Sequence, residues 1–158
     1  MISQDDRRWL DAAIDQAILG RDEGGIPIGS VLVHHPEGQP PRIIGRGHNR
    51  RVQSGSPILH GEMDALADAG RQPASVYRRS TLYTTLSPCS MCSGAALLYE
   101  IPRVVIGERR TFVGDEDRLR AAGVVVECLD DPKCVELMRG FIAANPALWN
   151  EDIGTNED

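Results

Sequence analysis

The chain of 158 residues lacks long apolar runs, since its uninterrupted apolar stretches are only a few residues long. A transmembrane helix needs about 20 such residues, so we expect no contact with a membrane. The first residues lead into an amphipathic pattern and not into the apolar core of a signal peptide. Only four cysteines are present. Their scarcity argues against a disulfide scaffold and favours a reducing, cytoplasmic compartment.

Positive charge is also scarce, with 17 Lys and Arg against 23 Asp and Glu and a formal net charge of −6. This balance disfavours a large phosphate-binding surface, so we expect no nucleic-acid partner. No internal repeat or low-complexity linker divides the chain. A chain of this length buries about 70% of its unfolded surface as one unit. We therefore expect a single domain over residues 1–158.

Helical and strand patterns alternate along the chain. Leu10, Ile14 and Ile18 lie on one face of a first helix, which Gly24 and Gly25 end. Further helices are expected over 60–69, 89–99, 115–121 and around 135–142, and strands over 29–34, 42–48, 81–86, 103–107 and 123–128. A helix and a hairpin followed by alternating strands and helices predict a three-layer α/β/α sandwich. Its sheet should be mixed, mostly parallel and five-stranded.

Three residues in the middle of the chain are of the kinds that zinc prefers. His60 stands two residues before Glu62, and Cys89 and Cys92 follow in a Pro-Cys-x-x-Cys run. A catalytic zinc site uses three protein ligands and leaves the fourth position to water, whereas a structural site uses four. Glu62 is not needed as a ligand and can carry protons for that water. The H-x-E…P-C-x-x-C pattern is typical of zinc-dependent base deaminases. We predict one Zn²⁺ per chain on His60, Cys89 and Cys92.

Two plainer interpretations of the cysteines compete with this one. A lone C-x-x-C can be a redox pair or half of a four-Cys structural zinc site. A redox pair does not need an upstream His-x-Glu. Cys128 and Cys134, which are separated by five residues, do not have the spacing of a second ligand pair. The catalytic interpretation therefore explains more of the pattern.

The predicted elements bring the ligands together. His60 and Glu62 open one expected helix, and Cys89 and Cys92 open the next. The positive ends of the two helix dipoles can face one point and favour thiolate over thiol. Cys89 and Cys92 are three residues apart and so share a helix face.

Further stretches make the chain resemble the yeast-type cytosine deaminases, a branch of the cytidine and deoxycytidylate deaminase superfamily. The resemblance runs over nearly the whole chain and is carried by residues 24–29 (GGIPIG), 45–49 (GRGHN), 59–62 (LHGE), 81–89 (TLYTTLSPC) and 149–154 (WNEDIG). It implies a homodimeric zinc enzyme of pyrimidine salvage. Its reaction would convert free cytosine to uracil and ammonia with a zinc-bound hydroxide.

The same resemblance implies how the base is held. It places the Asn49 amide and the Gly61 backbone N–H on the O2 carbonyl of the pyrimidine. The Ser87 backbone carbonyl would accept from the 4-amino group, and Asp152 would accept the N1–H that only a free base carries. Taken alone, Asn49 could be a turn residue, and Asp152 could belong to a solvated acidic end.

The walls of the pocket are implied in the same way. Phe112 and Trp149 resemble an aromatic lid over the ring, with residues 145–158 as a C-terminal lid segment, and Ile28 would line the opposite wall. Trp149 alone could also be a packing anchor for a terminal helix. Val52 stands where the family pattern has an aromatic residue, which leaves the substrate range open.

Three other functions compete. Because sequence does not define pocket volume, a deaminase of another free base, such as guanine or a related purine or pterin, stays open. A tRNA adenosine deaminase should carry a basic tail to hold RNA, whereas this chain ends in Glu157 and Asp158. A non-catalytic zinc-binding module would not need Glu62.

Overall fold

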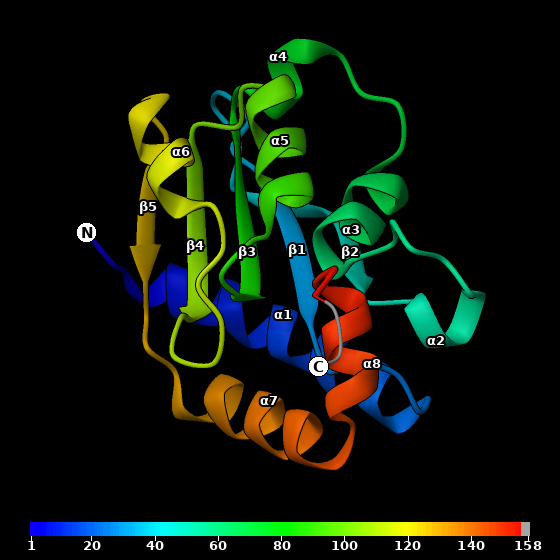
Figure 1. The fold of residues 1–158 in the computed structure, drawn as a ribbon. Helices are drawn as coiled ribbons and strands as arrows, with labels where there is room; N and C mark the ends of the chain where they lie inside the picture. Colours follow the sequence, from blue (N-terminus) through cyan, green and yellow to red (C-terminus); the bar gives the residue numbers. More distant parts are fainter. Residues whose placement is uncertain (156–158) are drawn as a thin grey trace.

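The computed structural model describes residues 1–155 (Figure 1). In chain order its elements are α1 (Gln4–Asp22), β1 (Gly29–His34), β2 (Arg42–His48), α2 (Arg51–Ser54), α3 (Gly61–Ala69), α4 (Ala74–Tyr77), β3 (Ser80–Leu86), α5 (Ser90–Leu98), β4 (Arg103–Glu108), α6 (Glu116–Ala121), β5 (Val125–Cys128), α7 (Pro132–Ala144) and α8 (Pro146–Asp152). None of the helices in this part of the chain is both long and apolar enough to cross a bilayer.

The five strands form one sheet in the order β2-β1-β3-β4-β5. β1 is antiparallel to both β2 and β3, whereas β3 pairs parallel with β4 and β4 with β5. Every strand except β1 therefore runs in the same direction. This confirms the prediction of a mixed, mostly parallel five-stranded sheet. β3 is the central strand.

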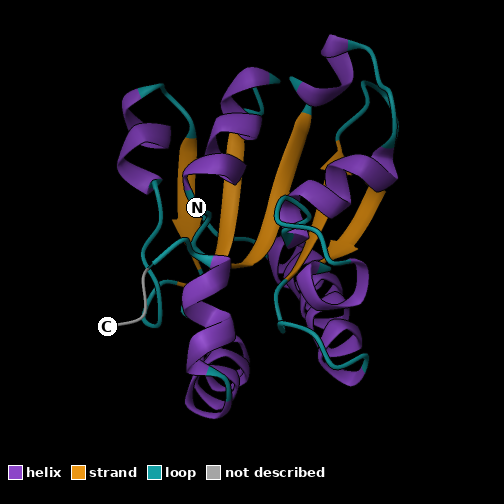
Figure 2. Ribbon diagram, turned by 45° about the vertical axis from the view of Figure 1, so that its right-hand side comes forward, coloured by secondary structure: helices purple, strands orange, loops and turns teal. Residues whose placement is uncertain are grey.

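Alternation along the strands divides the core into two layers. Val31, Val33 and Tyr83 face α1 and α7, and their cluster includes Trp9 and Cys134. The intervening residues of the same strands, with Leu32 and Leu82 among them, face the helices on the other side, α3 to α6. Figure 2 shows helices on both faces of the sheet. Because successive strand residues point to opposite faces, both faces are buried, and the three-layer prediction is confirmed.

A third apolar cluster closes one end of the sheet. It joins Ile28, which precedes β1, and Leu86, the last residue of β3, to Met138 of α7 and Trp149 of α8. In Figure 1, α7 and α8 lie below the arrowheads of β3 and β4. The carboxyl ends of parallel strands are where ligand sites form in open α/β sheets. The last two helices therefore cover the end of the sheet at which a site is expected.

Most element boundaries agree with those expected from the sequence. β1 and β2 have the predicted limits, while α3 and α5 begin one residue later than expected, so that His60 and Cys89 are their N-caps. β5 begins at Val125, two residues late. The four-residue helices α2 and α4 were not expected. Residues 156–158 of the expected lid segment, with the acidic pair at the end of the tail, lie outside the described residues.

Candidate active site

The three predicted zinc ligands meet at the beginnings of two helices. His60 is the N-cap of α3, Cys89 is the N-cap of α5, and Cys92 lies in the first turn of α5. Their ligand atoms all lie within 4.8 Å of one another, and His60 Nδ1 is 3.4 Å from Cys89 Sγ. Two ligands of a tetrahedral zinc, one nitrogen and one sulfur, stand roughly 3.6 Å apart. The donor set and its spacing therefore fit one zinc ion.

The imidazole of His60 is oriented by a carboxylate. Its Nδ1 faces Cys89, and its Nε2 lies 3.3 Å from Asp152 Oδ1. A zinc-binding histidine commonly donates its second ring N–H to a carboxylate, which fixes the tautomer and the ring orientation. Burial alone would lower the pKa of His60, but its hydrogen bonds to Asp152 and Cys89 outweigh burial and raise that pKa to about 10. Because Nε2 faces Asp152 and Nδ1 faces Cys89, Nδ1 is the nitrogen that can bind the metal, and binding there must displace a proton.

The local hydrogen bonds favour a thiolate at Cys89. Hydrogen bonds to Cys92 and His60 outweigh burial and lower the pKa of the Cys89 thiol to about 4. The same contact with Cys89, together with burial, raises the pKa of Cys92. Only the thiolate is a good metal ligand, so binding at Cys92 must release a proton.

Glu62 lies in the first turn of α3, beside the ligands. Its side chain is 4% exposed, and its Oε1 accepts a hydrogen bond of 2.8 Å from the Thr84 hydroxyl. Burial raises the pKa of Glu62, against the opposing influence of His60 and of the Thr84 hydrogen bond. A buried carboxyl with a raised pKa can both accept and donate a proton near neutral pH.

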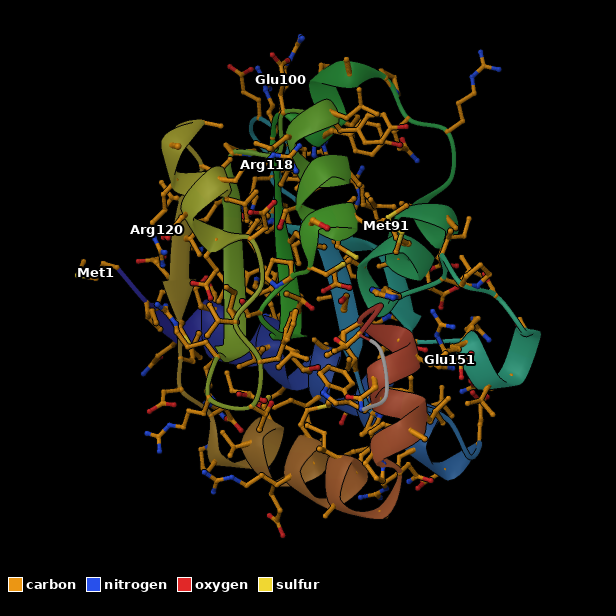
Figure 3. The ribbon with its side chains drawn as sticks, viewed as in Figure 1. Met1, Met91, Glu100, Arg118, Arg120 and Glu151 are labelled. Atoms are coloured by element: carbon orange, nitrogen blue, oxygen red, sulfur yellow. The ribbon has the colours of Figure 1, made fainter. Side chains whose placement is uncertain are left out.

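Asp152, on α8, is the most heavily bonded carboxylate of the site. It accepts hydrogen bonds from Asn49 Nδ2 to both oxygens, at 3.1 and 3.2 Å, and from Arg51 Nε at 2.8 Å. Burial opposes ionisation, but the bonds to His60, Arg51 and Asn49 outweigh it and hold the pKa of Asp152 below its usual range. The neighbouring Glu151 projects from α8 (Figure 3) and pairs with Arg51 Nη1 at 3.1 Å. Two adjacent carboxylates thus attach α8 to Asn49 and to Arg51, the first residue of α2.

A small cavity lies between these groups and α8. It is lined by Ile28, His60, Glu62, Leu86, Ser87, Cys89, Phe112, Trp149, Asp152 and Ile153, and has a volume of about 20 Å³. Phe112 and Trp149 meet edge to face above it, with ring centroids 5.7 Å apart. A cavity of this size holds about one water. A heterocyclic base therefore enters only when Phe112, Trp149 or α8 moves.

The structure brings most of the predicted site residues to this cavity. Three of them do not line it. Cys92 is buried in the first turn of α5, Asn49 is fully buried against Asp152, and Gly61 is packed where a Cβ would lie 3.1 Å from the Ile28 carbonyl. Val52 is 43% exposed on α2 and does not line the cavity.

Sequence reasoning overlooked four residues that belong to this region. Leu86 and Ile153 line the cavity, and both lie inside stretches that carry the family resemblance. Arg51 binds Asp152, and Thr84 binds Glu62. The signal for Thr84 was a polar residue on a buried strand face, and Arg51 had no local signal.

Comparison with known proteins shows to which family the chain belongs. The profile of the family described as the cytidine and deoxycytidylate deaminase zinc-binding region matches residues 3–108. A cytosine deaminase of Candida albicans is 51% identical over 150 residues, covering 95% of this chain and 97% of that protein. This chain belongs to that family of zinc-dependent deaminases. A tRNA-specific adenosine deaminase of Streptococcus pyogenes serotype M18 is more distant, with 35% identity over 88% of this chain and 83% of its own length.

Solved structures of other deaminases share the fold. A guanine deaminase from Nitrosomonas europaea superposes with a TM-score of 0.69 and 21% identity, covering 90% of this chain and 86% of its own. A dCMP deaminase from the cyanophage S-TIM5 superposes with a TM-score of 0.60 and 21% identity, covering 82% of this chain and 100% of its own. At such identities the likeness concerns the fold alone. The names of these two proteins give different substrates, guanine and dCMP, so the fold does not define the substrate, which must be argued from the site.

Proposed function

We propose that this chain is a zinc-dependent cytosine deaminase that acts on the free base in pyrimidine salvage. The observation that carries the proposal is the contact between the Asn49 amide and the Asp152 carboxylate beside His60. An amide donor next to a carboxylate acceptor complements a ring edge that presents C=O next to N–H. Cytosine has that edge at O2 and N1–H. The cytosine deaminase of Candida albicans, 51% identical, supports the same assignment.

Deamination replaces the 4-amino group of cytosine by the oxygen of a water molecule and releases uracil and ammonia. Zinc, when held by His60, Cys89 and Cys92, supplies a Lewis acid that makes water a nucleophile near neutral pH. Glu62 takes a proton from the attacking water, delivers it to ring N3, and then helps to protonate the departing amine. Its burial and raised pKa suit a group that must hold the proton between these steps.

The remaining site residues orient and enclose the base. In the proposed complex Asp152 accepts N1–H, and the Asn49 amide and the Gly61 backbone N–H donate to O2. The Ser87 carbonyl accepts from the 4-amino group. Phe112, Trp149 and Ile28 cover the ring, and the small volume of the cavity excludes bulk water during the reaction.

The segment 145–158 acts in this proposal as a lid of the single domain. Its helix α8 carries both Trp149 and Asp152, so one movement would open the cavity and withdraw the N1–H acceptor. Substrate would therefore be bound and released with the lid open and converted with it closed.

We further propose that the enzyme is a cytoplasmic homodimer without a nucleic-acid partner. Large apolar side chains that a second copy could cover are exposed on the single chain, among them Ile58 (56%), Leu98 (72%) and Val113 (63%). Sedimentation equilibrium should give twice the chain mass of 17.3 kDa. A monomer at all micromolar concentrations would refute the dimer.

Steady-state assays on the purified zinc-loaded protein test the function. Cytosine, cytidine, guanine and the wobble adenosine of a tRNA anticodon stem-loop are compared, each with and without a chelator. We expect chelator-sensitive release of ammonia from cytosine. Cytidine should be turned over at least about 10⁴-fold less efficiently, because ribose removes the N1–H that Asp152 needs. Equal kcat/KM for cytosine and cytidine, or activity on guanine or tRNA alone, would refute the free-cytosine assignment.

A further inference from the structure

A chain of three buried polar side chains ends on Glu62. The Ser30 hydroxyl donates to Thr84 Oγ1 at 3.0 Å, and the Thr84 hydroxyl donates to Glu62 Oε1 at 2.8 Å. Ser30 and Thr84 are fully buried, and Glu62 is 4% exposed. These bonds therefore form out of contact with solvent, where geometry is held most tightly.

Strand register brings the two hydroxyls together. Ser30 of β1 and Thr84 of β3 are direct partners in the antiparallel ladder, so their side chains lie side by side on one face. Farther along the same face, the partners Leu32 and Leu82 form the apolar core under the helices. Along this face the strand partners change from apolar, at Leu32 and Leu82, to polar, at Ser30 and Thr84. The polar pair lies where Glu62 of α3 contacts the sheet. Burying a hydroxyl without a partner is costly, so a polar pair at this place requires an acceptor.

The proton arrangement of the chain has a fixed direction. A hydroxyl has one proton to donate and can accept others. Thr84 donates its proton to the Glu62 carboxylate, and so it can only accept from Ser30. The Ser30 bond in turn prevents the Thr84 hydroxyl from rotating away. One carboxylate oxygen of Glu62 is thus held, which leaves the other for proton exchange.

We propose that Thr84, oriented by Ser30, is a positioning residue for Glu62: it holds Oε1 and directs Oε2 toward the reacting water and ring N3. The inference rests on the proposed function, since it assigns Oε2 as the atom that carries the proton in deamination. Neither Ser30 nor Thr84 lines the cavity in which the base would be held. Their loss should therefore lower kcat and leave KM and metal binding nearly unchanged.

The test compares Thr84→Val, which keeps the shape and removes the hydroxyl, with Thr84→Ser, which keeps the hydroxyl. Thr81→Val is the matched control, because Thr81 is a buried residue of the same strand whose hydroxyl contacts His35 instead. We expect Thr84→Val to lower kcat for cytosine about 10-fold, as the loss of one hydrogen bond to a charged group implies. KM should stay within about twofold. Thr84→Ser and Thr81→Val should retain wild-type kcat within a few-fold.

A second comparison separates positioning from a general structural effect. In a Glu62→Gln background, where proton transfer is already lost, adding Thr84→Val should cause no further loss of residual activity. Zinc content should match that of the parent in every variant. Thr84→Val leaves the buried Ser30 hydroxyl and Glu62 Oε1 without their partner, so its melting temperature should fall by several degrees, and all kinetics are measured well below the unfolding transition. Ser30→Ala, which leaves Thr84 in place, should lower kcat a few-fold and serves as the test if Thr84→Val does not fold.

The outcomes are distinct. A wild-type enzyme inactive on cytosine refutes the proposed function, and the Thr84 comparison is then made on whichever base it converts. If the wild type is active but Thr84→Val keeps kcat within twofold, the positioning role is wrong. A rise in KM with unchanged kcat, or an equal further loss in the Glu62→Gln background, also overturns it.

Discussion

At the scale of single residues, the candidate site consists of groups whose neighbours allow one orientation each. His60 is held between Cys89 and Asp152, and Glu62 is held by Thr84. Such preorganisation lets a site meet developing charge without rearranging. It also means that single substitutions should separate metal binding, proton transfer and substrate orientation.

Glu62→Gln should separate proton transfer from metal binding. The amide cannot exchange protons, so kcat should fall by at least about 100-fold, while zinc content stays near one per chain. Glu136→Gln, at an exposed position of α7, is the control. Turnover within a few-fold of wild type would mean that another residue carries the proton.

Asp152→Asn should affect both substrate and metal. The amide keeps the shape but cannot accept equally from N1–H and from His60, which Asp152 contacts at 3.3 Å. Substitutions behind a metal-binding histidine typically weaken metal affinity by about 10- to 100-fold. Competition with a chromophoric chelator measures this change, and cytosine kinetics at saturating zinc isolate the effect on turnover. Unchanged zinc affinity would show that His60 does not depend on this carboxylate.

Individual residues also show how much of the site could be predicted from the sequence alone. The zinc trio and Glu62 follow from residue types and spacing, because metal chemistry restricts both. Arg51 and Thr84 were not predicted, since their partners Asp152 and Glu62 lie far away in the sequence and only the fold brings them together. The interaction of Asp152 with His60 was missed for the same reason.

At the scale of elements, the site depends on helices that begin at the right residues. α3 and α5 begin immediately after His60 and Cys89, so these two ligands are fixed at cap positions and Cys92 in the first turn that follows. Periodicity predicted the long helices and the hairpin well because their buried faces repeat over many residues. It could not predict α2 and α4, which are single turns without a repeating face.

α7 supports the lid, and its N-cap should be important for stability. Asp131 accepts from the backbone N–H groups of Lys133 and Cys134 at 2.8 and 3.2 Å, and also pairs with Arg7 of α1. Asp131→Ala should therefore lower the free energy of unfolding by about 1–2 kcal/mol in urea titrations. Asp117→Ala, at a fully exposed position, should change it by less than about 0.5 kcal/mol. Equal losses of unfolding free energy in Asp131→Ala and Asp117→Ala would show that the Asp131 cap has no special role in stability.

At the scale of the whole molecule, one buried charge network joins elements from both ends of the chain. Asp6 of α1 accepts from Tyr83 of β3 at 2.7 Å and from Arg103 of β4 at 2.6 and 3.0 Å. Arg103 also binds Glu127 of β5 at 2.9 Å. The network lies on the face of the sheet covered by α1, away from the catalytic cavity. It can therefore be altered to probe global stability without disturbing the chemistry.

This network should make the fold sensitive to acid. Burial opposes ionisation of Asp6, but its bonds to Arg103, Tyr83 and the Ser3 backbone outweigh burial and hold the pKa of Asp6 well below its usual range. A lowered folded-state pKa stabilises the fold fully above the unfolded-state pKa of about 3.9. That stability is lost as the pH falls toward the folded-state value.

Asp6→Asn tests that dependence. At pH 7 the variant should be less stable than wild type by about 2–4 kcal/mol, because a buried charge pair loses one partner. Below about pH 4 the gap should begin to narrow, by at most about 1.4 kcal/mol per pH unit, because the unfolded wild type takes up a proton on Asp6 while the folded protein keeps this carboxylate ionised. Asp5→Asn, at the exposed neighbouring position, should track the wild type throughout. Urea titrations of the three proteins between pH 3 and pH 8 measure these differences. A constant gap between wild type and Asp6→Asn across that range would mean that the Asp6 charge does not stabilise the fold.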